Sequence, residues 1–325
     1  MKKKAFLLAA MIIGIIASFT VLTGCSGQTG NKNARISIVT TVFPEYDWIR
    51  NVLGDELENV SVTMLLDSGV DLHSYQPTAN DIVKISTADV FVYTGGESDE
   101  WVEDVLKEKI NEKQIDVNLL EVLGERALDE EIVEGMEAEE ETEEEEGTKD
   151  EHVWLSLKQA AYLTEKLADV FAEADPEYGE VYHKNADAYV SRLTELDEAY
   201  TAAVSGAKYK TLLFGDRFPF LYMVKDYGLN YYAAFSGCSA ESEASFETVV
   251  FLADKMNELS LPAIITLEGT AHKIAETIKE TAKLPEVKIL TMDSLQAVTR
   301  DRMEKGADYI EIMKQNLEVL REALQ

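Results

Sequence analysis

The chain has 325 residues, of which 46% are hydrophobic and 28% are charged, and this composition excludes both a disordered chain and a polytopic membrane protein. Lys and Arg number 30 against 61 Asp and Glu, and the resulting formal net charge of −31 excludes nucleic acid and anionic lipid as electrostatic partners. The cysteine count of 2 excludes a disulfide scaffold. An acidic surface suits a cation as ligand, although acidity also promotes solubility.

The N-terminal segment predicts export and attachment to a membrane. Lysines at positions 2–4 precede an apolar run over residues 5–21, and Leu22-Thr23-Gly24-Cys25 follows. This tetrapeptide resembles a bacterial lipobox, which implies that Cys25 is lipidated, whereas a transmembrane anchor is the alternative. We expect a lipoprotein signal peptide over residues 1–24 and a flexible tether over residues 25–33. The protein would then be lipid-anchored at the extracellular face of the cytoplasmic membrane.

Strands and helices alternate in the next part of the chain. Runs rich in β-branched residues predict strands over 36–42, 59–66, 89–95 and 115–121, and helical patterns fall at 45–53 and 78–86. Such alternation implies βαβ units and a mostly parallel sheet.

Residues 129–151 interrupt this pattern. They hold 14 acids and one lysine and so contribute −13 to the net charge. Because like charges at this density repel one another, we expect a disordered acidic loop.

The remainder predicts two helices and a second set of strands. The helices cover 156–174 and about 177–204, and the second is about 40 Å long at 1.5 Å per residue, enough to bridge two lobes. Strands are expected at 210–215, 229–235, 263–267 and 287–292, with helices at 218–227, 245–260, 271–283 and 302–324. The fold class is therefore α/β, with two α/β lobes, mostly parallel central sheets and a long rigid helix between them. The expected parts are an N-terminal lobe (34–175), a linking helix (176–206) and a C-terminal lobe (207–325).

Two of the four histidines lie where a parallel sheet places its ligands. His73 follows the second predicted strand and precedes a helix, and His152 follows the acidic loop and precedes a helix. Ligands bind at the carboxyl ends of parallel strands, and neutral imidazole is a common ligand for Zn²⁺. A lone loop histidine is usually only solvated, so the pair favours a metal site modestly. His183, inside the long helix, has no partner at ligand spacing.

Five motifs occur in a fixed order along the chain. They are His73-Ser74-Tyr75-Gln76-Pro77-Thr78, Tyr93-Thr94-Gly95-Gly96 with Glu100-Trp101, His152-Val153-Trp154, Asp226-Tyr227-Gly228-Leu229 and Lys273-Ile274-Ala275-Glu276-Thr277-Ile278. This ordered set resembles the signatures of the metal-binding lipoproteins of bacterial ABC importers for zinc and manganese. The resemblance covers nearly all of the chain after Cys25. It implies two lobes joined by a backbone helix, with metal held in the cleft between them. In zinc members the loop before the second signature is often rich in histidine, whereas here it is rich in glutamate.

The resemblance also implies a ligand set. His73 and His152 match the first two ligands, and Asp293 matches an aspartate at the end of a strand in the C-terminal lobe. The third ligand falls on Arg217, and a guanidinium cannot bind a cation. Its neighbour Asp216 is the leading replacement. The other candidates near strand ends of that lobe are Glu241, Glu243, Glu268, His272 and Cys238, the last either as a thiolate ligand or as a buried inert thiol.

These observations lead to one main function and two alternatives. We expect a monomeric binding protein, not an enzyme, that captures Zn²⁺, or next Mn²⁺, with Fe²⁺ left open, and delivers it to an ABC permease and its ATPase. A metallohydrolase would need an open coordination position and a general base, and no hydrolase motif occurs in the sequence. An adhesin-like or structural surface lipoprotein with a weakened or altered metal site is the other alternative, because Arg217 occupies a ligand position.

Overall fold

The computed structural model describes residues 34–137, 147–239 and 243–325, and Arg35–Gln325 forms one compact unit. The predicted signal peptide, the tether with Cys25, and Glu241 lie outside the described residues. Among the described helices, none combines the length and the apolar character that crossing a membrane requires.

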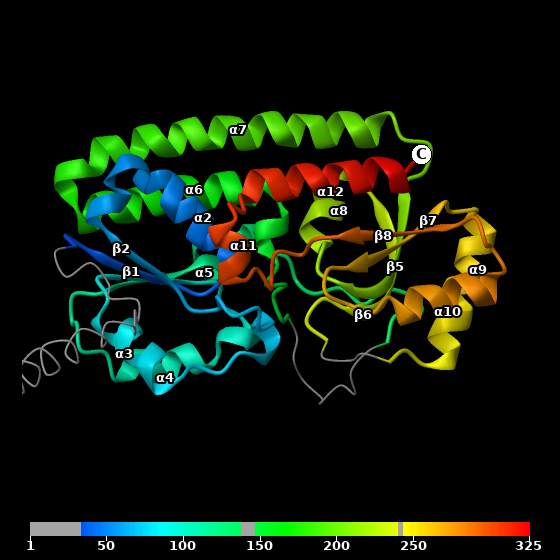
Figure 1. Cartoon of the computed structure of the whole chain (residues 1–325), viewed down its shortest axis with the longest axis horizontal. Coiled ribbons are helices and arrows are strands. Elements are labelled where there is room, and N and C mark those ends of the chain that lie inside the picture. Colours follow the sequence, from blue (N-terminus) through cyan, green and yellow to red (C-terminus); the bar gives the residue numbers. More distant parts are fainter. Residues whose placement is uncertain (1–33, 138–146, 240–242) are drawn as a thin grey trace, which may run out of the picture. The chain divides into compact units, whose positions relative to one another are not determined.

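Two four-stranded parallel sheets form the centres of two lobes (Figure 1). The N-terminal sheet has the order β2-β1-β3-β4 and the C-terminal sheet the order β6-β5-β7-β8. All the strand pairs within them are parallel. The strands are β1 (Ser37–Thr40), β2 (Ser61–Met64), β3 (Val90–Tyr93), β4 (Ile115–Asn118), β5 (Thr211–Phe218), β6 (Asn230–Ser236), β7 (Ala263–Leu267) and β8 (Lys288–Met292). The predicted fold class is confirmed, and each predicted strand is present with ends shifted by a few residues.

The helices around the N-terminal sheet are α2 (Phe43–Leu53), α3 (Ala79–Thr87), α4 (Trp101–Lys107) and α5 (Leu119–Leu123). Thr78 and Asp81 form a reciprocal capping box at the start of α3, which explains why the sequence predicted this helix well. Helix α4 was not predicted. Its N-cap residue, Glu100, makes no side-chain capping hydrogen bond, so a strong sequence signal for its start is missing.

A layer of long helices runs across both lobes. It consists of α6 (Leu157–Ala174), α7 (Gly179–Ser205) and α12 (Tyr309–Ala323). Helix α7 contacts α2 of the N-terminal lobe and α12, which itself packs on β7 and β8 (Figure 1). The predicted bridging helix is thus present, and it begins at Gly179 after a short turn at Pro176–Tyr178. The lobe boundaries at 175 and 206 stay predictions, because the contacts join both lobes into one unit.

The other helices of the C-terminal lobe are α8 (Leu221–Tyr227), α9 (Phe246–Leu259), α10 (Lys273–Ala282) and α11 (Arg300–Glu304). The predicted helix over 302–324 was wrong as a single element, because α11 ends at Glu304 and α12 begins at Tyr309. Gly306 between them has φ 90°, a left-handed conformation that does not continue a helix.

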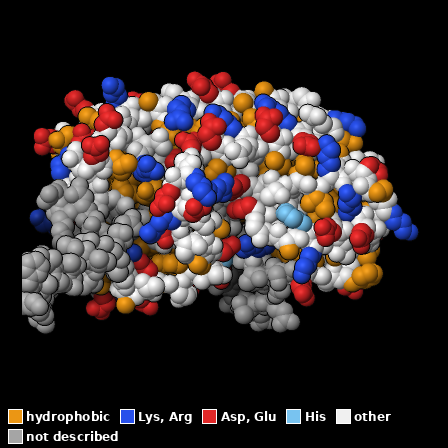
Figure 2. Space-filling model, in the orientation of Figure 1, with side chains coloured by type: hydrophobic (Ala, Val, Ile, Leu, Met, Phe, Trp, Pro, Cys, Tyr) orange, Lys and Arg blue, Asp and Glu red, His pale blue; other side chains and the backbone are white. Residues whose placement is uncertain are grey.

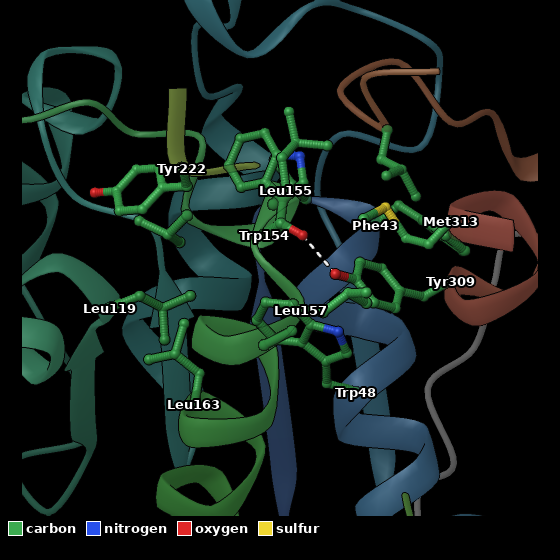
Figure 3. Packing of buried hydrophobic residues seen from close by; sticks show 14 of the residues in the cluster. Phe43, Trp48, Leu119, Trp154, Leu155, Leu157, Leu163, Tyr222, Tyr309 and Met313 are labelled. Carbon is green, nitrogen blue, oxygen red and sulfur yellow. Dashed lines mark hydrogen bonds between the residues drawn. The ribbon is translucent and has the colours of Figure 1, made fainter. Parts of the chain in front are cut away.

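The main core surrounds the segment that leads into α6. Trp154, Trp48 and Tyr309 are fully buried there (Figure 3). The Tyr309 hydroxyl donates to the Trp154 carbonyl oxygen at 2.5 Å, and the Trp154 indole N–H donates to the Ser294 carbonyl oxygen at 2.8 Å. Residues of the C-terminal lobe and of α12 therefore fix the backbone next to His152.

The acidic segment was predicted to be a disordered loop, and for the residues 129–137 and 147–151 that prediction was wrong. Glu137 pairs with the edge of β6, where its N–H donates to the Ala234 carbonyl oxygen at 3.0 Å. The Tyr222 hydroxyl donates to the Asp150 carbonyl oxygen at 2.9 Å. Repulsion among the acids is offset because Met136 is buried and Lys225 pairs with Glu131. We refer to residues 129–137 as the strap. On the face in Figure 2, acidic and basic side chains are interspersed, so the excess charge does not form one patch there.

Candidate metal centre

His73 is held in a short turn after β2. Asp71 precedes the 3-10 turn Leu72–Ser74, and its carboxylate accepts the His73 N–H at 3.1 Å. The ring Nδ1 lies 2.7 Å from the Ser98 hydroxyl oxygen. Burial and the neighbouring His152 ring lower the pKa of His73 to about 3. The imidazole is therefore neutral at neutral pH, as a metal ligand must be.

His152 is held by the acidic residues before it. The Asp150 carboxylate accepts the His152 N–H at 2.9 Å and lies 3.2 Å from Nδ1 of the ring. Burial opposes the charged imidazole, but the carboxylates of Asp150 and Glu151 outweigh it and raise the pKa of His152. Glu151 also accepts the Ser98 N–H at 2.7 Å, which links the two histidine turns. A carboxylate behind a histidine fixes the tautomer that presents Nε2 to a metal.

The two histidines meet through their Nε2 atoms, which are 3.3 Å apart. Zn–N bonds are about 2.0–2.1 Å long, so two nitrogens at a tetrahedral zinc lie about 3.3–3.4 Å apart. The rings are thus already spaced for one ion. The structure thus brings together the two histidines that the sequence singled out, and their binding of a metal stays a prediction.

Cys238 is the third residue that the structure brings to this point. Its Sγ and the two imidazole nitrogens all lie within 4.8 Å of one another, which makes this the one such group among the described residues. Gly237 allows the close approach, because a Cβ there would lie 2.8 Å from the His152 ring and 3.0 Å from the Phe218 carbonyl oxygen. Burial and the carboxylates of Glu151 and Glu130 raise the pKa of the Cys238 thiol above its usual range. A metal would therefore have to displace its proton.

Gln296, which the sequence did not single out, completes the cluster. Its amide nitrogen lies 2.5 Å from Nε2 of His152 and 3.1 Å from Nε2 of His73. A glutamine amide is neither ionisable nor a thiol, so its position four residues after β8 carries no recognisable metal-ligand signal in the sequence.

Asp216 does not join this group. Its carboxylate accepts the Thr270 hydroxyl at 2.9 Å and the backbone N–H groups of Leu267 and Arg217 at 3.2 and 3.0 Å. Arg217 crosses the cleft instead and donates to the Asp71 carboxylate at 2.7 Å. It also donates to the Ser239 carbonyl oxygen at 3.4 Å, next to Cys238. Arg217 thus contacts both the loop that carries His73 and the loop that carries Cys238.

Asp293 also lies apart from the cluster. Its carboxylate accepts the Leu295 N–H at 2.9 Å and forms an ion pair with Arg302 at 2.5 Å. Glu268 holds Ser294, and burial together with Asp293 raises the pKa of Glu268 to about 7. Both carboxylates shape the loop that carries Gln296.

The last two sequence candidates, Glu243 and His272, line a cavity of about 450 Å³ between the lobes. His73, Asp216 and Arg217 belong to the same lining. Neither Glu243 nor His272 is part of the group with ligand spacing among the described residues. The cavity offers a path from solvent to the His73 side of the cluster.

A two-lobed α/β protein with paired imidazoles and a thiol between its lobes belongs to the class of metal-binding proteins. The family model of zinc-uptake complex component A, periplasmic (ZnuA), matches residues 38–323, and the chain belongs to this family of solute-binding proteins for metal uptake.

Among curated relatives, the zinc-binding protein AdcA of Streptococcus pyogenes is 31% identical over 329 residues, covering 99% of this chain and 61% of AdcA. The chain thus spans less than two thirds of that relative. The high-affinity zinc uptake system protein ZnuA of Bacillus subtilis is 28% identical, over 95% of this chain and 96% of its own length. Among solved structures, the Zn(II)-bound ZnuA-like domain of Streptococcus pneumoniae AdcA has a TM-score of 0.70 at 29% identity, covering 89% of this chain and 98% of that domain.

Proposed function

We propose that the protein captures Zn²⁺ between its lobes through His73, His152 and the Cys238 thiolate, and delivers it to an ABC permease. The observation that carries this proposal is the 3.3 Å spacing of the two Nε2 atoms, with a thiol within 4.8 Å. The names of the relatives above support zinc as the cargo. Imidazole and thiolate ligands suit Zn²⁺ better than Mn²⁺, which prefers oxygen ligands.

Cys238 is our proposed third ligand in place of Asp216, and Asp293 is not required. Three donors already use the Asp216 carboxylate, and Arg302 pairs with Asp293. The Cys238 thiol instead hydrogen-bonds the Glu130 carboxylate, which can accept the proton that the metal displaces.

Delivery to a permease and attachment by a lipid belong to the same proposal, which the lipobox-like Cys25 and the family support. A diacylglyceryl anchor holds a protein firmly at a membrane, whereas one acyl chain does not. The binding protein would remain beside its permease and the associated ATPase at the extracellular face of the cytoplasmic membrane, as a monomer.

The test is elemental analysis of the chain from Ser26 onward, which keeps every described helix and strand, after chelation and reloading with equimolar Zn²⁺ and Mn²⁺. We expect one zinc per chain, lost in His73→Ala and Cys238→Ala but kept in Asp216→Asn and Asp293→Asn. His183→Ala is the matched control, because His183 is exposed on α7.

Three outcomes would contradict the proposal. Zinc lost in Asp216→Asn and kept in Cys238→Ala would return the third ligand to Asp216. Retained manganese in place of zinc would overturn the cargo. No retained ion would favour the adhesin-like alternative.

A further inference from the structure

The cavity between the lobes is larger than a metal ion requires. Its volume is about 450 Å³, and its lining includes His73 of the N-terminal lobe and Lys273 and Ile274 at the start of α10. Cavities that bind small organic molecules typically measure about 300–1,000 Å³, whereas an ion held by side chains needs only a fraction of that volume. The cavity therefore has room for a small organic molecule beside the ion.

The candidate metal centre is open toward this cavity. Of its three residues, His152 is fully buried, whereas His73 and Cys238 are only partly buried. His73 is also part of the cavity lining. An ion on these three side chains would have three protein ligands, and zinc takes four and sometimes five. A molecule in the cavity can therefore supply a further ligand from the side of His73.

An irregularity in β5 places a positive charge at the cavity. Between the paired positions Phe214 and Arg217, β5 has one residue more than its neighbour β6, and such a bulge re-aims the side chains that follow it. Gly215 lies in this bulge and lets α10 approach closely, because a Cβ there would lie 2.8 Å from the Ala275 Cα atom. As a result, Arg217 of β5 and Lys273 of α10 line the same cavity.

Arg217 has more hydrogen-bonding capacity than the protein uses. Its guanidinium donates to the Asp71 carboxylate at 2.7 Å and to a backbone carbonyl oxygen at 3.4 Å. A guanidinium has five N–H donors, so these two bonds use only part of its capacity, and the Lys273 ammonium adds further donors. Two carboxylates, Asp216 and Glu243, belong to the same lining. Side chains of both signs around one cavity suit a zwitterion, and its carboxylate suits the donors of Arg217 and Lys273.

We propose that this cavity binds a free α-amino acid that chelates the same ion, so that the protein captures zinc as an amino acid complex. The amino nitrogen, after losing its proton, and one carboxylate oxygen would bind the ion. The other carboxylate oxygen would accept hydrogen bonds from Arg217 and Lys273. This proposal deepens the proposed function and rests on it, because it needs zinc on His73, His152 and Cys238.

The first test measures the binding of isotope-labelled L-histidine to the chain from Ser26 onward by equilibrium dialysis, with and without zinc. L-Histidine is the probe because its amino, carboxylate and imidazole groups all bind zinc. We expect one histidine per zinc-loaded chain and none on the zinc-free chain.

The matched variants are Lys273→Ala and Lys279→Ala, because both lysines lie on α10 and only Lys273 lines the cavity. Lys273→Ala should keep the zinc affinity of the wild type, measured by competition with a chelator, since Lys273 is not a metal ligand. It should bind L-histidine about tenfold more weakly, because a charge-assisted hydrogen bond to the carboxylate is lost. Lys279→Ala should bind both as the wild type does. Equal histidine binding in the two variants would overturn the proposal.

The second test replaces L-histidine by histamine, which has the same imidazole and amino groups but no carboxylate. Histamine should bind to the zinc-loaded wild type about tenfold or more weakly than L-histidine, and Lys273→Ala should not weaken it further. Histamine that binds as tightly as L-histidine would contradict the role of Arg217 and Lys273. If the wild type holds zinc through His73 and Cys238 but binds no histidine, the amino acid site fails and the proposed function stands. If the wild type holds no zinc with or without histidine, both fail.

Discussion

The two lobes share one strand order but place different chemistry on it. In each sheet the first strand lies between the second and the third, and the second strand is at an edge. The loop after the second strand carries His73 in the N-terminal lobe and Cys238 in the C-terminal lobe. The strand order thus determines where a metal-binding side chain can lie, and the type of side chain at that position determines which ion the site suits.

The ends of the first strands show the same correspondence for carboxylates. Glu45 follows β1 and accepts the Thr94 hydroxyl at 3.0 Å, from the segment after β3. Asp216, near the end of β5, accepts the N–H of Leu267 at the end of β7. In both lobes an acid ties the first strand to the third. This parallel is our physical reason for assigning Asp216 a structural role and Cys238 the metal.

The comparison predicts a larger loss of stability for Glu45→Ala than for Asp216→Ala. Glu45 is fully buried, and burial raises its pKa, while Thr40, Thr41 and Thr94 donate to its carboxylate. Removing it leaves buried donors without partners, at a cost of about 3 kcal/mol. Asp216 is 9% exposed, and water can replace part of its role, so about half that cost is expected. Urea unfolding of the metal-free proteins measures the loss of stability in Glu45→Ala and in Asp216→Ala. Equal losses in the two variants would contradict the comparison.

A second prediction concerns Cys238 and the protons that zinc displaces. Because the thiol pKa is raised, zinc binding near pH 7 should release at least one proton, and Cys238→Ala should release one fewer. The zinc affinity of Cys238→Ala should be about 100-fold lower than that of the wild type, or roughly 2.7 kcal/mol. Calorimetry in buffers of different ionisation enthalpy counts the protons. Asp216→Asn is the control, and a proton count that falls in this variant but not in Cys238→Ala would reverse the assignment.

The third prediction compares a buried acid from each lobe. Burial, with Glu45 and Glu151 nearby, raises the pKa of Asp99 to about 8, and burial with Asp293 raises that of Glu268 to about 7. A raised carboxyl pKa means that the folded state binds the proton more tightly, so both groups make the protein less stable as pH rises from 5 to 8. Asp99→Asn should remove roughly 2 kcal/mol of this loss, and Glu268→Gln about half as much. Denaturation of the metal-free proteins at several pH values measures how the free energy of unfolding depends on pH. If this dependence were unchanged in Asp99→Asn, the prediction would be contradicted.

The smallest expected effect is at the contacts between the lobes. Arg217→Gln removes the ion pair with Asp71, which also accepts the His73 N–H. We expect about 1 kcal/mol less stability and a zinc affinity lower by about fivefold. Arg300→Gln is the matched control, because Arg300 pairs with Asp67 of the same loop but is half exposed. Equal zinc affinities in the two variants would show that Arg217 does not position His73.

The fold could be predicted because its signals are local. β-branched runs and capping residues such as Thr78 mark the elements, and both His73 and His152 lie in segments that precede a predicted helix. Our proposed third ligand, Cys238, was only one of several candidates in the sequence, because carboxylates at strand ends equally serve contacts within one lobe, as Asp216 does. Gln296 was missed because its role depends on distances between segments far apart in the chain.

The strap has a consequence for the isolated protein as well. Strand β6 is an edge strand, and exposed edges are templates for pairing with other chains. Glu137 occupies one hydrogen-bonding position of this edge, and the sequence that follows it, residues 138–146, contains seven glutamates. Glu137 of the strap thus covers part of the sheet edge beside the loop of Cys238, and removing the strap should make the protein more prone to aggregate.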